Sequence, residues 1–449
     1  SPSCGNIALL ATATASSRPY HVLRHHDFRL LWGSQLVSLT GKQMQVVALN
    51  WHVYLLTGSP LALGLVGLTR VVPIIIFSLW GGILADRIDR KRIILVSQGA
   101  MLVLSGVLAV LTLRGEATLF LLYAVNAASG AASAFDNPAR QALVPRLVPQ
   151  GELPSALALI LVMTHVAFIG GPGLAGLLLA GGTAMAPGAT ASAMTAASTA
   201  SLRVVGAIYA IDSITFLAVI VALLRMRTNT APEPGTVTDE RPIESLKTGL
   251  RFVFTTKVMV WIMGLDFVAT FFSGSLSLLP IFADRILHVG PFGYGWLVAA
   301  PALGAFLGSI YTSVAHLPRR QGRVLLWAIA AYGACTVVYG LGPTFVIVFL
   351  ALAGTGLADL VSTVIRQTLR QLLTPDGLRG RMTSVNMIFF MGGPQLGEME
   401  AGLVAAMFTS VTLGARASVV IGGVITLLVT ALVASRSRVV RDYEPPVAA

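Results

Sequence analysis

The chain has 449 residues, of which 55% are hydrophobic and only 11% are charged. Soluble proteins usually carry about a quarter charged residues, so the composition excludes an ordinary soluble fold and indicates a chain that faces lipid along much of its length. The formal net charge is +12. The basic residues stand in short clusters between apolar runs, which is typical of cytoplasmic loops of a membrane protein and argues against a nucleic-acid partner.

Residues 1–28 are expected to form a cytoplasmic N-terminal tail. Its first 20 residues are rich in Ala, Ser and Thr. No basic stretch precedes an apolar core and no cleavage site follows, so we do not expect a signal peptide. Cys4 and Cys335 lie far apart in the sequence and predict neither a disulfide framework nor a metal site.

Twelve apolar runs are long enough to cross a bilayer, which takes roughly 20 residues. Short breaks between them, such as Gly58-Ser59-Pro60, are typical of tight turns between antiparallel helices. The sequence therefore predicts an all-α integral membrane protein with twelve transmembrane helices. The expected helices cover residues 29–56, 60–85, 92–113, 118–139, 154–180, 204–225, 258–282, 293–315, 324–341, 344–370, 382–408 and 412–434.

The basic residues between the helices predict the orientation. With the N-terminus inside, only Arg114, Arg203, Arg285 and Arg416 fall on the outside, while nearly all other loop cations fall on the cytoplasmic side. Because Lys and Arg are enriched in cytoplasmic loops, we expect both termini in the cytoplasm. The predicted location is the bacterial inner membrane.

Two segments interrupt the regular spacing of the helices. Residues 226–244 contain three prolines and mixed charges, which predicts a flexible linker. Leu246, Leu250 and Val253 then share one face, as in a short interfacial helix. Residues 181–201 are almost uncharged and are expected to form an external loop without an assigned function. The predicted organisation is a six-helix bundle at 29–225, a linker with the interfacial helix at 226–257, a second bundle at 258–434 and a cytoplasmic tail at 435–449.

Two short motifs recur at about half the length of the chain. Arg140-Gln141-Ala142-Leu143 matches Arg366-Gln367-Thr368-Leu369, 226 residues later, and Gly170-Gly171-Pro172 matches Gly392-Gly393-Pro394, 222 residues later. Two matches in the same order at similar spacing indicate a duplication. Because each half has six helices, the two repeats have parallel topology, related by an axis along the membrane normal.

The second expected helix runs into the segment Gly81-Gly82-Ile83-Leu84-Ala85-Asp86-Arg87-Ile88-Asp89-Arg90-Lys91-Arg92. It resembles the signature between helices 2 and 3 of the major facilitator superfamily, where a glycine, an aspartate and a basic run recur. The resemblance implies the fold of that superfamily and a gate on the cytoplasmic side. Asp89 stands where the general pattern favours glycine. The residues assigned to the gate are Gly82, Asp86, Arg87, Arg90, Lys91, Asp136 and Arg140.

Other segments narrow the resemblance. Asp136-Asn137-Pro138-Ala139-Arg140-Gln141 and Leu396-Gly397-Glu398 look like the branch that contains enterobactin and macrolide exporters. The helix 5 segment with Gly171, Pro172 and Gly176 is similar to the antiporter motif of the superfamily, which implies export. Proton-coupled exporters often carry an arginine early in helix 4, but residues 120–128 contain none.

Several polar side chains lie inside the predicted membrane helices. A charge there costs about 2.5–3.5 kcal/mol, so it needs a partner, a wet cavity or a function. One interpretation is a structural ion pair of Asp266 or Glu398 with Lys42 or Arg70, and the other is proton or substrate handling. His165 can titrate, although a lone helical histidine is more often a packing group. The resemblance places helices 1, 4, 7 and 10 around a central cavity. The candidates for proton or substrate binding are Gln35, Lys42, Gln45, Asn126, His165, Asp212, Asp266, Asp359, Glu398 and Glu400.

The resulting hypothesis is a monomeric secondary transporter that exports small amphipathic molecules, drug-like or siderophore-like, in exchange for protons. No phosphate-binding loop with a Lys-Ser or Lys-Thr ending occurs, so ATP is not expected to drive it. No cofactor or metal is expected. One alternative is uptake or facilitated diffusion of a lipid-like solute. The other is an integral-membrane enzyme, but the histidines are scattered along the chain and no Cys-x-x-Cys spacing exists.

Overall fold

The computed structural model describes residues 19–182, 191–228, 242–314, 320–375, 379–437 and 441. Within these ranges the chain is almost entirely helical and contains no β-strand. Most of the expected N-terminal tail, the middle of the linker and the end of the C-terminal tail lie outside the described residues.

The first group of long helices covers the first half of the chain. A short helix, η1 (Pro19–Arg24), precedes it. Ser59 and Thr118 cap α3 and α5 by accepting hydrogen bonds from backbone amides, and Asp89 caps α4 in the same way. The six helices are α2 (His26–Thr57), α3 (Pro60–Arg87), α4 (Arg90–Leu113), α5 (Leu119–Leu143), α6 (Leu153–Gly182) and α7 (Ala191–Arg225).

The second group follows α8 (Pro242–Thr255), the helix in the linker. Its first span is broken into four pieces, which are α9 (Lys257–Phe272), η4 (Leu276–Leu278), α10 (Leu279–Ile281) and the π-helical turn η5 (Phe282–Ile286). The remaining five helices are α11 (Gly290–Val314), α12 (Gln321–Leu341), α13 (Phe345–Leu373), α14 (Arg379–Ala406) and α15 (Val411–Arg436).

Ten helical segments of the described chain are long and apolar enough to cross a membrane. The other two of the twelve spans are α2 and α14, which are 32 and 28 residues long and carry more polar side chains than the rest. The prediction of an all-α membrane protein with twelve helices in two six-helix repeats is confirmed.

Two expected boundaries were wrong. The sixth span was expected at residue 204, but α7 already begins at Ala191, so part of the expected external loop is helical. The reason is its alanine-rich start, because alanine has the highest helix propensity. The seventh span was expected as one helix and instead breaks around Ser273 and Gly274. A Cβ on Gly274 would lie 2.8 Å from the Pro394 carbonyl oxygen, so this backbone lies directly against α14.

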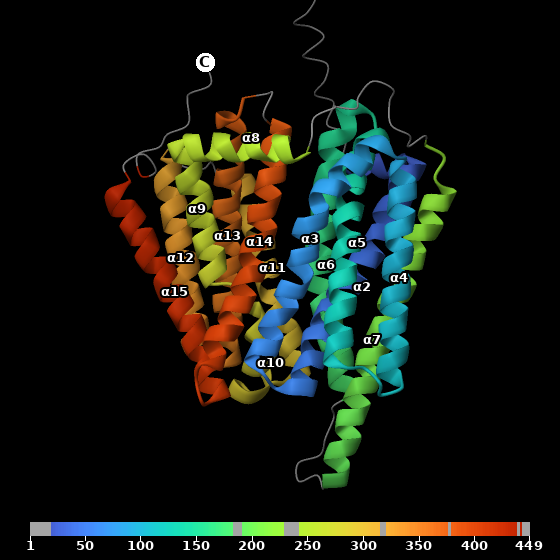
Figure 1. The fold of residues 1–449 in the computed structure, drawn as a ribbon, viewed down its shortest axis with the longest axis vertical. Helices are drawn as coiled ribbons and strands as arrows, with labels where there is room; N and C mark the ends of the chain where they lie inside the picture. The colour runs from blue at the N-terminus through green and yellow to red at the C-terminus, as the bar shows by residue number, and fades with distance from the viewer. Residues whose placement is uncertain are drawn as a thin grey trace, which may run out of the picture.

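The two groups stand side by side (Figure 1). α8 lies across one end of the second group, and the described C-terminus is at the same end; we call this the linker end and the opposite one the far end. The first turns of α7 project beyond the other helices at the far end (Figure 1). α3 leans onto α14 near the far end and lies apart from it near the linker end.

The apolar core shows the same asymmetry. One buried cluster contains residues of both groups, among them Trp51 and Val53 of α2 with Phe282 and Tyr294 of the second group. Two other clusters are each confined to one group and lie toward the linker end: one surrounds Ile94 and Leu143, and the other surrounds Ile365. Among the described residues, the groups therefore share a core at the far end and keep separate cores at the linker end.

Asp27 ties the start of α2 to the chain leaving α7. Its Oδ2 atom accepts hydrogen bonds from the backbone amides of Arg227, at 3.0 Å, and Thr228, at 2.8 Å, and from the Thr228 hydroxyl, at 2.5 Å. Asp27 precedes the predicted span. Burial raises the pKa of this carboxyl, but the hydrogen bonds, chiefly from Thr228 and His26, outweigh burial and lower the pKa to about 2.

We expect Asp27→Ala to lower the free energy of unfolding at pH 7 by about 1–3 kcal/mol, because Arg227 and Thr228 lose the charged acceptor of their hydrogen bonds. The unfolded carboxyl has a pKa of about 3.9, above that of the folded one. The stabilisation is therefore complete above pH 4 and disappears as the pH falls toward 2. Thermal unfolding of the detergent-solubilised protein across this range measures the difference. Glu116→Ala, at an exposed acid, is the control; an Asp27→Ala deficit that did not shrink in acid would contradict the assignment.

Candidate functional site

Glycine pairs let the two groups touch at the far end. A Cβ on Gly64 of α3 would lie 2.7 Å from the Glu398 carbonyl oxygen and 3.1 Å from the Gly402 Cα atom of α14. A Cβ on Gly176 of α6 would lie 2.9 Å from the Gly295 Cα atom of α11. Only small residues allow helix backbones to approach so closely in a membrane. Gly176 belongs to the helix 5 motif, which lies on α6, so this motif includes a residue at the junction of the groups.

The other members of the helix 5 motif pack elsewhere. Gly171 faces α2, where an added Cβ would lie 2.6 Å from the Gln43 Cβ atom. Pro172 is buried within α6, and its carbonyl oxygen lies 2.5 Å from the Cβ position of Gly295. The motif thus presses α6 against α2 on one side and against the second group on the other.

A polar contact joins the groups beside these glycines. The Tyr54 hydroxyl of α2 donates a hydrogen bond to Asp284 of η5 and accepts one from Nε of Arg285, at 3.1 Å. The Arg285 guanidinium also lies 5.7 Å from the centre of the Tyr54 ring. Next to them, the rings of Trp51 and Tyr294 stack with their centres 5.5 Å apart. We call Tyr54, Asp284 and Arg285 the far-end latch.

We expect Tyr54→Phe to open the far end more often, because it removes both hydrogen bonds of the latch. Hydrogen bonds to charged groups contribute about 1.5–3 kcal/mol, so the open population should rise by about tenfold or more. Ser277→Cys, placed at a buried position in η4 after Cys4 and Cys335 are replaced by serine, reports opening through its rate of reaction with a water-soluble maleimide.

Tyr123→Phe is the matched control for the latch. Its hydroxyl donates to the Ala62 carbonyl oxygen at 2.7 Å, a contact within the first group. The control should leave the labelling rate near that of the unaltered protein. Equal labelling of the Tyr54→Phe and Tyr123→Phe proteins would show that the latch does not hold the far end closed.

Glu398 lies at the junction, between the two groups. It is half-buried on α14, and its carboxylate attracts the Arg70 guanidinium of α3 electrostatically. A Cβ on Gly67 would lie 2.7 Å from a Glu398 carboxylate oxygen, so the acid packs directly against the α3 backbone. Glu398 also lines a cavity of about 200 Å³ in the second group, together with Asp359, Tyr332, Tyr339 and several hydroxyl side chains. This polar cavity joins the junction to the interior of the second group.

Arg366 joins two of the candidate acids in the second group. Its guanidinium donates to Asp266 of α9, and it also donates to Asp359 at 3.4 Å and to the Thr363 hydroxyl at 2.7 Å. Asp266 therefore does not pair with Lys42 or Arg70, which were its expected partners. Both of those cations belong to the first group, whereas Arg366 projects from α13 within the same group as Asp266.

The first group contains the equivalent contact. Arg140 of α5 donates to Asp136, one turn earlier, and to Gln35 of α2. Gln98 Nε2 of α4 donates to the second Asp136 oxygen at 2.9 Å. In both groups an arginine at the matching place of the repeat reaches from the fourth helix to the first. The duplication is therefore visible in the side-chain contacts as well as in the sequence.

A second buried network in the first group contains Lys42, Gln45 and Asp212. Ser105 Oγ donates to an Asp212 carboxylate oxygen at 2.7 Å and accepts from Gln45 Nε2 at 3.0 Å. The Lys42 ammonium donates to the Ser133 hydroxyl at 2.9 Å and is attracted by the Asp212 charge. Asp212 is fully buried, and its other carboxylate oxygen has no hydrogen-bond partner within the described chain.

Three candidates lie outside these networks. Asn126 donates to the Val66 carbonyl oxygen at 2.8 Å and to the Thr69 hydroxyl at 3.0 Å, so it holds α5 against α3. His165 bonds with the Leu161 carbonyl oxygen of its own helix, and its ring lies 5.7 Å from that of Phe306. Glu400 is half-buried on α14 and does not line the polar cavity.

The basic run of the gate motif is anchored to the first group. Arg90 donates to the Ala142 carbonyl oxygen at 3.4 Å, and Lys91 donates to the Met226 carbonyl oxygen at 3.2 Å. The Asp89 carboxylate accepts a hydrogen bond from the Lys91 backbone amide at 3.0 Å. Asp89, which stands where the superfamily pattern favours glycine, therefore caps α4. The backbones of Gly82, Asp86 and Arg87 belong to the last turns of α3, and the side chains of Asp86 and Arg87 are outside the described part.

A cavity of about 270 Å³ opens beside Arg140 at the linker end. Gln35, Arg140 and Gln141 supply its polar groups, while Phe28, Trp32 and other apolar side chains form the walls. Apolar walls with a single guanidinium can bind a molecule that is apolar over most of its surface and carries an anionic or polar group.

Sequence reasoning missed Arg366, Ser105 and the far-end latch. Arg366 could have been found, because it is the repeat partner of Arg140. Ser105 is one of many serines in an apolar helix, and no sequence signal distinguishes it. Tyr54 and Arg285 are separated by most of the first repeat and meet only in the folded chain.

The comparisons with known proteins agree with this architecture. A profile of the family described as "Transmembrane secretion effector" matches residues 17–446. The chain is 26% identical over 409 residues to the enterobactin exporter EntS of Escherichia coli O1:K1, covering 90% of this chain and 92% of that protein. EntS of Shigella boydii serotype 18 has the same identity over 408 residues, with the same coverage.

Solved transporter structures share the fold. A bacterial homologue of the human lysosomal transporter Spinster, in an inward-facing and occupied conformation, superposes with a TM-score of 0.66 at 17% identity, covering 96% of this chain and all of that chain. The nucleoside transporter NupG gives a TM-score of 0.67 at 12% identity, covering 91% of this chain and 98% of that chain.

Proposed function

The chain belongs to the transmembrane secretion effector family, within the major facilitator superfamily, and from this premise we propose that it exports small amphipathic molecules across the bacterial inner membrane in exchange for protons. The linker end is then the cytoplasmic side, with both termini, and the protein works as a monomer. The enterobactin exporters support export of siderophore-like or drug-like compounds, since they cover nearly the whole chain.

The observation that carries the proposal is the division of the apolar core. A core shared at the far end and separate cores at the linker end are what we expect of two groups that rock as rigid bodies. Alternating access requires this arrangement, because the groups can rock about a site at the middle of the membrane. The far-end latch closes the outside in this position.

The amphipathic cavity beside Arg140 supports the substrate class. It combines Trp32 and Phe28 with one guanidinium, which suits an aromatic or macrocyclic molecule with an acidic or polar group. The position of this cavity at the proposed cytoplasmic end also suits binding of a substrate that comes from the cell interior.

Glu398 supports the exchange with protons. In this structure the Arg70 guanidinium attracts the Glu398 carboxylate electrostatically across the junction. When the groups rock apart at the far end, Arg70 and Glu398 move further apart, and a carboxylate in the membrane without that attraction costs about 2.5–3.5 kcal/mol. Binding a proton from the outside removes that cost. Return of Arg70 then displaces the proton toward the polar cavity, so each cycle carries protons inward while the substrate leaves.

Transport in ATP-free proteoliposomes tests the proposal. A panel of catecholate siderophores and macrolides is offered on the side of the linker end, with and without an imposed pH gradient. We expect accumulation of at least one compound on the other side only when the gradient is present. Accumulation that ignored the gradient would refute proton exchange, and net movement only toward the linker end would refute export.

A further inference from the structure

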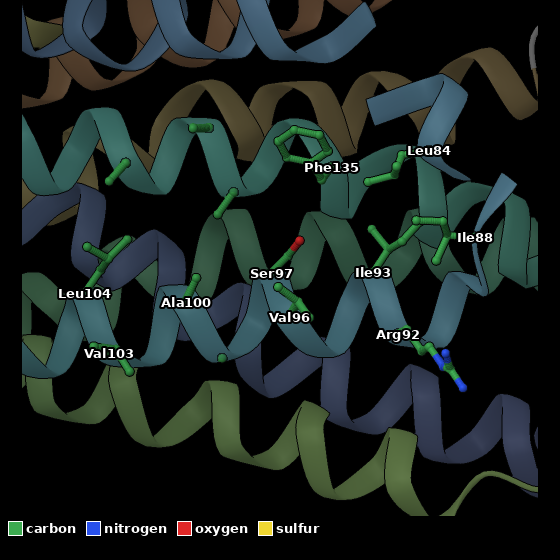
Figure 2. A pocket seen from close by; sticks show the side chains of 14 residues that line it. Leu84, Ile88, Arg92, Ile93, Val96, Ser97, Ala100, Val103, Leu104 and Phe135 are labelled. Carbon is green, nitrogen blue, oxygen red and sulfur yellow. The ribbon is translucent and has the colours of Figure 1, made fainter. Parts of the chain in front are cut away.

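A long apolar groove runs along the outside of the first group, between α3, α4 and α5 (Figure 2). Its volume is about 880 Å³, several times that of either cavity described above. The lining is apolar apart from Ser97 and Arg92, and it includes Ile88, Phe135 and Leu104. None of the residues of the latch, the polar cavity or the Arg140 cavity belongs to it.

The groove exists because α3 and α4 diverge. These two helices are consecutive in the chain but have little contact with each other, whereas α5 packs closely against both. Gly99 and Ala100 of α4, with three alanines of α5, leave the space between the helices unfilled. The ridge of α4 beside it exposes Val96 and Val103 by 73% and 59%. In a membrane protein such side chains face acyl chains, so the groove opens to the bilayer.

The length of the groove matches one membrane leaflet. Its lining along α4 extends from Arg92 to Leu104, and twelve residues of helix rise about 18 Å. Half of a bilayer's hydrocarbon core is about 15 Å thick. The groove starts in the first turn of α4, at the linker end, and therefore covers the depth of the leaflet on that side.

The charge at the mouth of the groove selects the headgroup. Arg92 lies at the end of the groove near the α3–α4 turn, with its guanidinium directed away from the apolar lining (Figure 2). Its neighbours Arg90 and Lys91 donate to backbone carbonyl oxygens of the first group. Arg92 is exposed, and within the described chain it has no hydrogen bond or ion pair. A phosphate at the leaflet surface is the natural partner of such a guanidinium.

We propose that this groove binds a phospholipid with an anionic headgroup. One acyl chain lies between Ile88 and Leu104 against the alanines of α5, and the headgroup phosphate pairs with Arg92. The apolar floor and the single cation match the acyl chain and the phosphate of a lipid. A second copy of the chain would instead have to present an apolar ridge with an acidic residue at its end, so we favour a lipid. The site does not depend on which molecule the protein transports.

Native mass spectrometry of the full-length protein tests the site. Protein in mild detergent is mixed with equal amounts of phosphatidylglycerol and phosphatidylcholine that have identical acyl chains. We expect the protein to retain phosphatidylglycerol preferentially. Arg92→Gln should lower this preference by about fivefold, the contribution of one basic residue near an anionic lipid. Ala100→Phe should lower retention of both lipids, because the ring fills the groove.

Matched variants separate the site from general effects. Arg29→Gln removes an exposed cation at the same end, and Ala431→Phe adds a ring to the exposed face of α15; both should bind lipid as the unaltered protein does. Equal retention of the two lipids by the unaltered protein would overturn the proposal. Equal losses in the Arg92→Gln and Arg29→Gln proteins would also overturn it, since they would reflect net charge alone. Neither readout involves transport, so failure here leaves the proposed export untouched.

Discussion

Glu398→Gln should abolish the response of export to a pH gradient while leaving substrate movement down its own gradient intact. Glutamine keeps the size of the side chain and its packing against Gly67, but it cannot exchange a proton or attract Arg70. One coupling interaction between two sites is worth about 5–150-fold. We therefore expect the ratio of gradient-driven to passive transport in proteoliposomes to fall by at least about tenfold.

Glu400→Gln is the control for this prediction. Glu400 is on the same helix two residues later, and it does not line the polar cavity. Since residues two apart face different sides of a helix, this substitution should leave the ratio unchanged. Arg70→Gln should reproduce the loss seen with Glu398→Gln, because no guanidinium would then return to displace the proton from the Glu398 carboxylate. A Glu398→Gln protein that still responded fully to the gradient would assign Glu398 a structural role.

The arrangement of helices was predictable because it is encoded locally. A run of apolar residues spans a bilayer whatever its neighbours are, and turns such as Gly58-Ser59-Pro60 mark the ends. The error at α7 arose where composition was ambiguous, since a run of Ala, Ser and Thr suits either a loop or a helix. The break near Gly274 was missed because it depends on the approach of α14.

The partners inside the membrane were less predictable. The sequence identifies Asp266, Glu398, Lys42 and Arg70 as intramembrane charges, but pairing depends on which faces of which helices meet. Only the attraction between Glu398 and Arg70 was among the expected pairs. Arg366 was not among the candidate residues, although it reaches Asp266 from α13. The repeat contained the missing information, because Arg140 and Arg366 both reach from the fourth helix of their group to the first.

Arg366→Gln should be the most destabilising single substitution in the second group. It leaves Asp266 without its ion pair in the membrane interior, where breaking a buried pair by removing one partner costs about 3–5 kcal/mol. It also removes the contact to Asp359. We expect a large fall in the thermal stability of the detergent-solubilised protein and a similar loss of correctly assembled protein in the membrane.

Asp266→Asn in the same chain should recover most of that loss. The double variant keeps a hydrogen-bonding side chain at both positions and has no charge at either. Replacing both members of a buried ion pair often changes the stability little. The measured coupling between the two substitutions then isolates the ion pair. Additive losses would mean that Arg366 acts through Asp359 or through packing, and that Asp266 is paired elsewhere.

The first group supplies a comparison at the matching place of the repeat. Arg140→Gln removes an arginine that contacts Asp136 on its own helix and Gln35 on α2, so only one acid loses its partner, and Gln98 still donates to that acid. We therefore expect Arg140→Gln to destabilise the protein less than Arg366→Gln, yet to reduce transport, because Arg140 lines the amphipathic cavity and belongs to the proposed gate. Of the two matching arginines, Arg366 would then serve mainly stability and Arg140 mainly transport. Stability and transport measured side by side on the two variants test this division, and an equal loss of both properties in each would contradict it.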